Sequence, residues 1–521
     1  MKRVEPEHWE KQLAKLPLRQ GGFSKELMQK VRERVESGPP QRRERRWLRW
    51  SPAAALALAA VIGIAAQPGL LAEAVAKLSK TRPPASPEAL TPLDSEQKLT
   101  LKVGNIADIS FGSRYGAAFM ERYPNVALQT DAPGGLAPWS SKARVELDDW
   151  LVREKPDVLI LTPEQYERLA KNGKLYALDD AIRQDGFDLN NMHAGVVDQL
   201  RSSGGGKLYG LAPQYEQLAI YYNKDMFDRY NVSYPKNGMS WEELLQLAGA
   251  FPAHGKSKQQ AYGLSVPQGV SPFELVQLAG KARGLRLTDA EGTRATIDTP
   301  QWRQLWSQAL EAYRNGVVYP QLQATSSTAA AETYRSDAFL TGQAAMALQS
   351  YGFAYEIAEA RRLAVLPAFT WQTAAEPTDP SMPGRSASFT AGAVYAVHAE
   401  SAQKRAAWEL VKFVNSEETA RAALSASPGA FTSSRLPSLA ASGLPGTAAK
   451  GLEAFYTLLP VKSTPPAAAP PSSFYRDVER LALQLSEAVL SGRKTLDAAL
   501  QELQAQGQRT LTQGRSDALK R

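Results

Sequence analysis

The chain has 521 residues, four histidines and no cysteine, so it is too long for one compact core and can form neither disulfides nor thiolate metal sites. Its basic balance is local: the first 50 residues carry 14 Lys and Arg against 7 Asp and Glu, and the remainder carries 47 against 46. We therefore predict no nucleic-acid partner, because phosphate binding requires clustered cations on the globular part.

Residues 1–46 form a basic segment in which Phe23, Leu27, Val31 and Val35 recur every four residues. This spacing places one apolar stripe along a helix and predicts an amphipathic helix on the cytoplasmic side. Such a helix would lie on anionic lipid or, alternatively, dock to a cytoplasmic partner.

A long uncharged stretch follows the basic segment. Residues 50–72 contain no charged side chain, and about 20 apolar residues suffice for a helix to cross a bilayer. Arginines precede the stretch, which predicts a single-pass anchor over 47–75 with the N-terminus in the cytoplasm and the rest outside. A signal peptide cleaved near Ala66 and a buried core helix are the alternatives. Residues 76–97 are rich in proline and predict a linker.

Strands and helices alternate after the linker. The residue patterns predict strands at 99–103, 126–130 and 156–161, and helices at 115–124, at 140–154 and from Pro163 onward. The run Val158-Leu-Ile-Leu161 is apolar throughout, as expected for a strand that is buried on both faces of a parallel sheet. This alternation indicates an α/β, doubly wound fold.

Four segments carry a family resemblance, in the same order along the chain. They are Tyr209–Phe227 with Ser240-Trp-Glu-Glu-Leu244, Phe339–Leu348 with Tyr351-Gly-Phe353, Lys404–Ala420, and Ser491–Leu500. Together they resemble the family 1 extracellular solute-binding proteins, the group of maltose-binding protein, over residues 98–513.

The resemblance implies a two-lobed periplasmic-binding-protein fold of type II-like topology, with the ligand in a cleft between the lobes. Lobe one would comprise 98–212 plus 369–430, and lobe two 213–366 plus 450–513. The chain would cross between them near 211–215, 365–368 and 427–455. Closure of the lobes around a ligand would then be read by a partner protein.

The resemblance and the chemistry of sugars also suggest ligand contacts. Glu216 matches the position of a sugar-binding glutamate, and a carboxylate accepts hydrogen bonds from hydroxyl pairs; an ion-paired glutamate in the hinge is the alternative. Tyr215 is a candidate aromatic platform. Phe353 falls where related sugar binders place a stacking Trp, with Tyr351 and Tyr355 beside it, and packing in the core is the alternative for Phe353.

Three further candidates lie at predicted strand ends. Asp108 follows the first strand and Thr162 follows the strand at 156–161, and ligands of α/β sheets meet the carboxyl ends of the strands. Helix capping is the alternative role for Asp108. Phe389 precedes a strand at 393–397 and lies, by the resemblance, at the cleft edge of lobe one, with core packing as its alternative.

Motifs of catalysis are missing from the sequence. The four histidines are not spaced for a metal site, and neither a Gly-x-Ser-x-Gly elbow nor a Walker loop occurs. We therefore predict a binding protein without catalytic residues, cofactor or metal. The expected partners are a mono- or oligosaccharide and the permease subunits of an ABC importer. A membrane-anchored ligand sensor is the first alternative, and a polysaccharide-processing enzyme is the second.

Overall fold

The computed structural model describes residues 90–132, 141–251, 261–266, 271–319, 330–364, 369–427, 429, 431–435, 451–461 and 470–519. The predicted amphipathic helix, membrane anchor and most of the Pro-rich linker lie outside these residues. Within the described part of the chain, no helix combines the length and apolar character needed to cross a membrane.

Five described strands form the first sheet, which mixes parallel and antiparallel pairings. Their order is β2 (Val126–Asp131), β1 (Leu99–Asn105), β3 (Val158–Leu161), β12 (Val394–Val397) and β4 (Gly210–Leu211). β1 pairs in parallel with both β2 and β3, and β12 is antiparallel to β3 and β4. All four residues of β3 are buried, as its continuous apolar sequence predicts.

Helices connect and cover the strands of this first lobe. They are α5 (Ala117–Arg122) after a π-helical turn (Gly112–Gly116), α6 (Ser141–Glu154), α7 (Pro163–Lys171), α8 (Asp179–Gln184), α9 (Ala194–Ser203), α16 (Lys404–Val414) and α17 (Glu417–Ala426). The strands and helices that the sequence predicts between residues 99 and 171 are confirmed as elements of this lobe. The mixed α/β class is confirmed with them.

The second sheet contains four described strands. Their order is β7 (Tyr262–Ser265), β8 (Ala344–Ser350), β6 (Leu218–Asn223) and β9 (Trp371–Ala375). Successive side chains of β6 point to opposite faces. Ile220 and Tyr222 enter one apolar core, whereas Ala219 and Tyr221 enter another.

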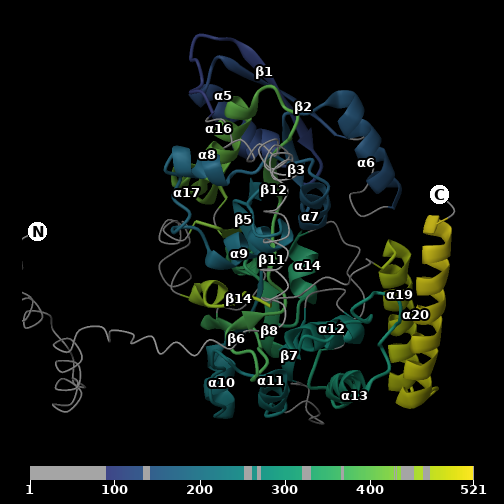
Figure 1. The fold of residues 1–521 in the computed structure, drawn as a ribbon. Helices are drawn as coiled ribbons and strands as arrows, with labels where there is room; N and C mark the ends of the chain where they lie inside the picture. The colour runs from purple at the N-terminus through teal and green to yellow at the C-terminus, as the bar shows by residue number, and fades with distance from the viewer. Residues whose placement is uncertain are drawn as a thin grey trace, which may run out of the picture. The chain divides into compact units, whose positions relative to one another are not determined.

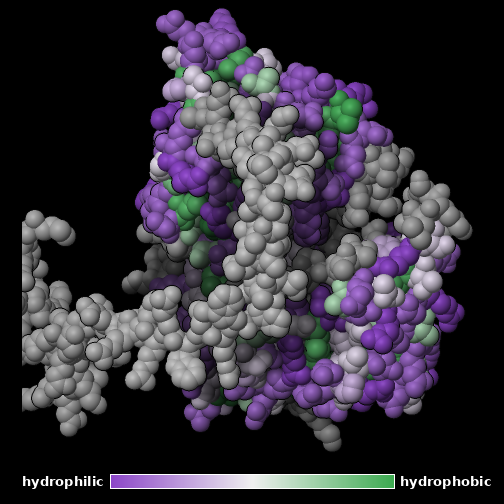
Figure 2. All heavy atoms as spheres, in the orientation of Figure 1, coloured by the Kyte–Doolittle hydropathy of each residue, from purple (hydrophilic) through white to green (hydrophobic). Residues whose placement is uncertain are grey.

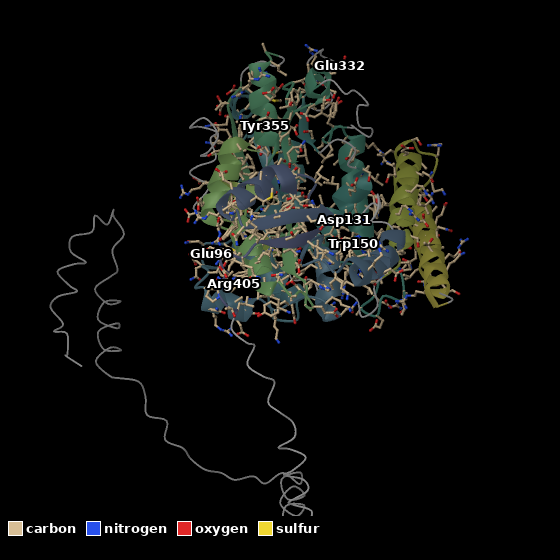
Figure 3. All side chains as sticks on the ribbon, turned by 90° about the horizontal axis from the view of Figure 1, so that it is seen from above. Glu96, Asp131, Trp150, Glu332, Tyr355 and Arg405 are labelled. Atoms are coloured by element: carbon tan, nitrogen blue, oxygen red, sulfur yellow. The ribbon has the colours of Figure 1, made fainter. Side chains whose placement is uncertain are left out.

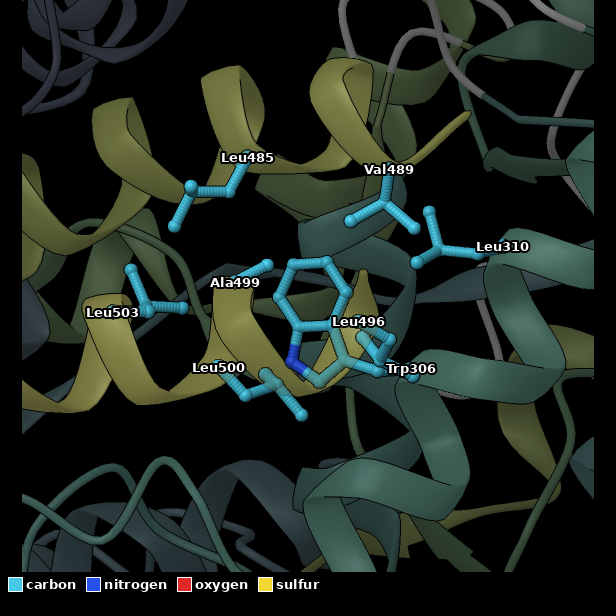
Figure 4. A pocket seen from close by; sticks show the side chains of 8 residues that line it. All are labelled: Trp306, Leu310, Leu485, Val489, Leu496, Ala499, Leu500 and Leu503. Atoms are coloured by element: carbon cyan, nitrogen blue, oxygen red, sulfur yellow. The ribbon is translucent and has the colours of Figure 1, made fainter. Parts of the chain in front are cut away.

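The helices of the second lobe cover these two faces. They are α10 (Lys224–Tyr230), α11 (Trp241–Ala248), α12 (Pro272–Ala282), α13 (Pro300–Arg314), α14 (Ala330–Ser336), α15 (Phe353–Arg362), α19 (Ser472–Leu490) and α20 (Leu496–Leu519). Figure 1 shows α19 and α20 side by side at the edge of this lobe, next to α12 and α13. A small apolar pocket lies where α13, α19 and α20 meet, lined by Trp306 and leucine, valine and alanine side chains (Figure 4).

Two small sheets are formed where the chain passes between the two large sheets. The first joins β11 (Thr390–Ala391), β5 (Gln214–Glu216) and β13 (Thr432–Ser433), all antiparallel to β5. The second pairs β10 (Arg385–Ser386) with β14 (Leu459–Pro460). These strands come from three separate passages of the chain, and Figure 1 shows β5, β11 and β14 between the two large sheets. We call this set of strands the hinge.

The second passage between the sheets differs from the expected one. We predicted a crossing at 365–368, but β9 lies beyond that range and still pairs with β6 of the second sheet, Ala219 opposite Ala375. The chain therefore leaves the second sheet only after Ala375, and β9 (Trp371–Ala375) is part of that sheet. A Val-Leu-Pro sequence at 365–367 resembled the crossing, but the pairing of the next strand decides which sheet a segment joins.

The surface in view is predominantly hydrophilic. Among the described residues on this face, Figure 2 shows exposed apolar side chains in small, separate patches. Scattered single apolar residues of this kind are ordinary on soluble domains and indicate no extended docking surface by themselves.

Candidate functional site

An aromatic cluster packs within the hinge. The rings of Tyr215 and Phe389 are stacked with centroids 4.9 Å apart, and the His193 ring lies 4.7 Å from Tyr215 and 5.3 Å from Phe389. The Tyr215 hydroxyl donates a 2.7 Å hydrogen bond to the carbonyl oxygen of Phe455. Both Tyr215 and Phe389 are buried, so they join hinge segments that are distant in sequence rather than offering a ring face to solvent.

His193 contributes to this cluster as a helix cap. It precedes α9, and its Nδ1 accepts a 3.1 Å hydrogen bond from the amide of Gly195. Burial lowers the pKa of His193 to about 4, so the imidazole is neutral at pH 7. A neutral ring suits stacking against two aromatic neighbours. The sequence pattern did not predict a role for His193.

Glu216 is placed differently from its neighbour. Side chains alternate along β5, so Glu216 points away from the face on which Tyr215 is buried. The side chain is exposed, and no described residue forms a hydrogen bond or ion pair with its carboxylate. Its backbone lies opposite Thr390 in the hinge sheet. Among the described residues, the Glu216 carboxylate is therefore exposed and without a polar partner, in the central strand of the hinge sheet.

Asp108 and Thr162 lie at one edge of the first sheet, because they follow the parallel neighbours β1 and β3. Asp108 Oδ1 accepts the amide of Ser110 at 2.9 Å, and Oδ2 accepts the hydroxyl of Tyr395 at 2.7 Å. Thr162 caps α7 through a reciprocal pair of hydrogen bonds with Gln165. Both side chains are only partly buried, so they retain some exposed surface at this edge while they already hold local structure.

The predicted stacking residues lie in the core of lobe two. Phe353 is 2% exposed, and its ring meets Tyr221 edge-on at 5.2 Å. Tyr351 is also buried and meets Phe455 edge-on at 5.4 Å. In contrast, Tyr355 is exposed in the first turn of α15, which packs against α14 (Figure 3). Among the aromatic residues of this segment, Tyr355 presents its ring to solvent.

Ile109 is a surface residue that the sequence analysis missed. It lies directly after Asp108, at the edge of the first sheet where β1 ends, and its side chain is fully exposed, at 103% of the reference area. An isoleucine beside a strand is expected in the core, so the sequence carries no signal for this position.

A shallow polar pocket, lined in part by Asp131 and Trp150, opens elsewhere on lobe one between β2 and α6 (Figure 3).

A family model described as bacterial extracellular solute-binding protein matches residues 151–449, more than half of the chain. The chain belongs to the bacterial extracellular solute-binding proteins. Membership agrees with two α/β lobes joined by three passages of the chain.

Solved structures of similar fold support this assignment. The chain is similar to a family 1 extracellular solute-binding protein of Alicyclobacillus acidocaldarius, with 19% identity, a TM-score of 0.61 and coverage of 80% of this chain and 100% of that one. A sugar-binding protein MalE of Xanthomonas citri has 18% identity, a TM-score of 0.59 and coverage of 81% and 100%. A sugar transporter protein of Rhizobium etli, in an open conformation, has 20% identity, a TM-score of 0.58 and coverage of 79% and 99%. At these identities the likeness concerns the fold of this solute-binding protein.

Proposed function

We propose that this solute-binding protein captures a mono- or oligosaccharide between its lobes and delivers it to an ABC importer by closure about the hinge. The observation that carries the proposal is the exposed carboxylate of Glu216 in the central hinge strand, which has no partner among the described residues. Carboxylates bind pairs of sugar hydroxyls, and the similar proteins of Xanthomonas citri and Rhizobium etli are described as sugar-binding and sugar-transporting.

The proposed contacts come from both lobes. Asp108 and Thr162 would contribute polar edges from lobe one, and Tyr355 would supply the exposed ring from lobe two. We propose Tyr355 as the stacking residue instead of the predicted Phe353 and Tyr351, because a ring must present a face to stack on a sugar and those two rings are buried. Tyr215 and Phe389 would support Glu216 from beneath.

The ligand class is tested with the full-length protein and a panel of mono- and oligosaccharides. A ligand that binds the native state raises the unfolding temperature in proportion to the logarithm of its concentration above Kd. We expect at least one sugar to raise the unfolding temperature and to give a saturable calorimetric binding curve. Stabilisation by peptides or polyamines alone would contradict the carbohydrate assignment.

Replacing Glu216 tests the site itself. We expect Glu216→Ala to weaken binding of the sugar identified in the panel by at least about tenfold, because hydrogen bonds to a charged group contribute roughly 1.5–3 kcal/mol. The unfolding temperature without ligand should stay within about 1 °C, since the side chain is exposed and unpaired. Titration calorimetry measures the change in affinity. Glu121→Ala, an exposed glutamate on α5, is the control and should bind as the wild type does.

The N-terminal sequence favours a second function with the same binding chemistry. The uncharged stretch at 50–72, preceded by arginines, supports a single-pass anchor with 1–46 in the cytoplasm, and importer subunits do not need such a segment to bind ligand. Closure would then be relayed to a signalling partner. Deleting residues 1–40 separates the two functions. Loss of ligand-dependent gene expression with intact uptake supports the sensor, whereas intact uptake with unchanged gene expression supports the importer alone.

A further inference from the structure

A buried carboxylate stands where the second passage leaves the second sheet. Glu376 directly follows β9 and is 0% exposed. Its Oε1 accepts hydrogen bonds from the Ser386 hydroxyl and, at 3.4 Å, from the Ser388 amide. Its Oε2 has no hydrogen-bond partner among the described residues. Buried polar groups are nearly always paired, so a carboxylate kept here against its desolvation cost requires an explanation.

The partners of Glu376 connect it to the other passages of the hinge. The Ser388 hydroxyl accepts the Leu218 amide at 2.8 Å, at the start of β6 in the first passage. The Ser386 hydroxyl accepts the Phe389 amide at 2.8 Å, which holds the turn into β11. Ser386 also lies in β10, which pairs with Pro460 of β14 in the third passage. The two serines that bind the Glu376 carboxylate thus also connect the second passage to the first and to the third.

We propose that Glu376 is a positioning residue that sets the resting geometry of the hinge, and thereby of the ligand cleft. Through Ser386 it fixes the turn that brings Phe389 onto Tyr215, and through Ser388 it fixes the start of β6. Glu376 itself is too deeply buried to contact a solute in this state. This role rests on the proposed function, because the geometry of the hinge matters for binding only if the lobes close around a ligand.

The ionisation of Glu376 adds a readout that ordinary packing would not give. Burial raises its pKa to about 6, against smaller lowering effects from Ser386, Ser388 and the charge of Lys281 on α12. Arg283, next to Lys281 on the same helix end, is paired with Glu242 and Asp379. The ordinary value of 4.5 applies to the unfolded chain. The contribution of protonated Glu376 to the free energy of unfolding is therefore fully present below about pH 4.5, and it is lost as the pH rises through about 6.

The Glu376→Gln variant keeps an Oε1 acceptor and removes the ionisation. We expect it to unfold about 2–4 °C above the wild type at pH 7.5 and at the same temperature at pH 4.5. In the ligand-free protein at pH 7.5, amide hydrogen exchange of residues 386–391 should slow several-fold in the variant. Equal unfolding temperatures at both pH values, or unchanged exchange at 386–391, would overturn the proposal.

A second variant decides the matter if Glu376→Gln fails to fold. Ser388→Ala removes the acceptor for the Leu218 amide, and we expect exchange at 214–218 and 386–391 to accelerate at least tenfold while β1 and β3 stay protected. Ser486→Ala is the matched control and should leave the hinge unchanged, because this buried serine donates its hydroxyl to the Ala482 carbonyl within α19. Acceleration spread evenly over both lobes would show a general packing role instead. Because no ligand is used, failure of the carbohydrate assignment would not affect these results.

Discussion

Replacing Gly263 by alanine is expected to destabilise the second lobe by about 3 kcal/mol or more, because the new methyl group has no space. Gly263 lies in β7, and a Cβ there would overlap the carbonyl group of Ala248 at the end of α11. Both backbones are held in place: the Gly263 amide donates to Val317 at 3.0 Å, and Leu264 pairs with Met346 of β8. Neither side can move without breaking hydrogen bonds.

The measurement is urea or thermal unfolding of the purified variant, followed by circular dichroism. Gly112→Ala is the matched control, because Gly112 has open space around its Cβ position and lies in helical turn geometry. We expect the control to change the free energy of unfolding by less than about 0.5 kcal/mol. A Gly263→Ala variant as stable as this control would show that α11 and β7 are not packed as closely as described.

Replacing Asp185 by asparagine is expected to cost about 2–3 kcal/mol of stability, because it breaks a largely buried charge network in the first lobe. The Asp185 carboxylate accepts both Arg405 nitrogens at 2.8 and 3.0 Å, Trp408 Nε1 at 3.0 Å and Lys412 Nζ at 2.7 Å. Glu409 bonds to the same two cations. An amide would leave Arg405 and Lys412 with one carboxylate instead of two.

The pH dependence of stability should change in the same variant. Burial alone would raise the pKa of Asp185, but the hydrogen bonds from Arg405, Lys412 and Trp408 outweigh it and lower the pKa to about 2. The stabilisation is therefore present above about pH 4 and is lost as the pH falls toward 2. Asp185→Asn should lose this acid-dependent component in thermal unfolding between pH 4 and 2.

An exposed ion pair provides the comparison for Asp185. Glu417 pairs with Arg421 one turn along α17, and both side chains are at least 40% exposed. We expect Glu417→Gln to cost less than about 0.5 kcal/mol and to keep the acid dependence of the wild type. If Asp185→Asn behaved like Glu417→Gln, solvent would be screening the network around α16 much more than its burial implies.

The sequence alone was sufficient for the strands and helices between residues 99 and 171. The apolar run of β3 and the proline that opens α7 act within a few residues, so local pattern determines them. The family resemblance likewise depends on segments that are contiguous in the chain. The sequence was not sufficient to assign a strand to one of the two sheets. β9 is part of the second sheet because it pairs with β6, and this long-range pairing cannot be predicted from local composition.

Site residues show the same division. The sequence identified Glu216 from its place in a motif, and its exposure in β5 is consistent with a ligand contact. It could not tell that Phe353 turns into the core while Tyr355, two positions further along α15, faces solvent, because that depends on which face of the helix packs on the sheet. Glu376 carried no signal either, since Glu-Pro after an apolar run is typical of a surface turn. Its burial exists only because segments 170 residues apart meet at the hinge.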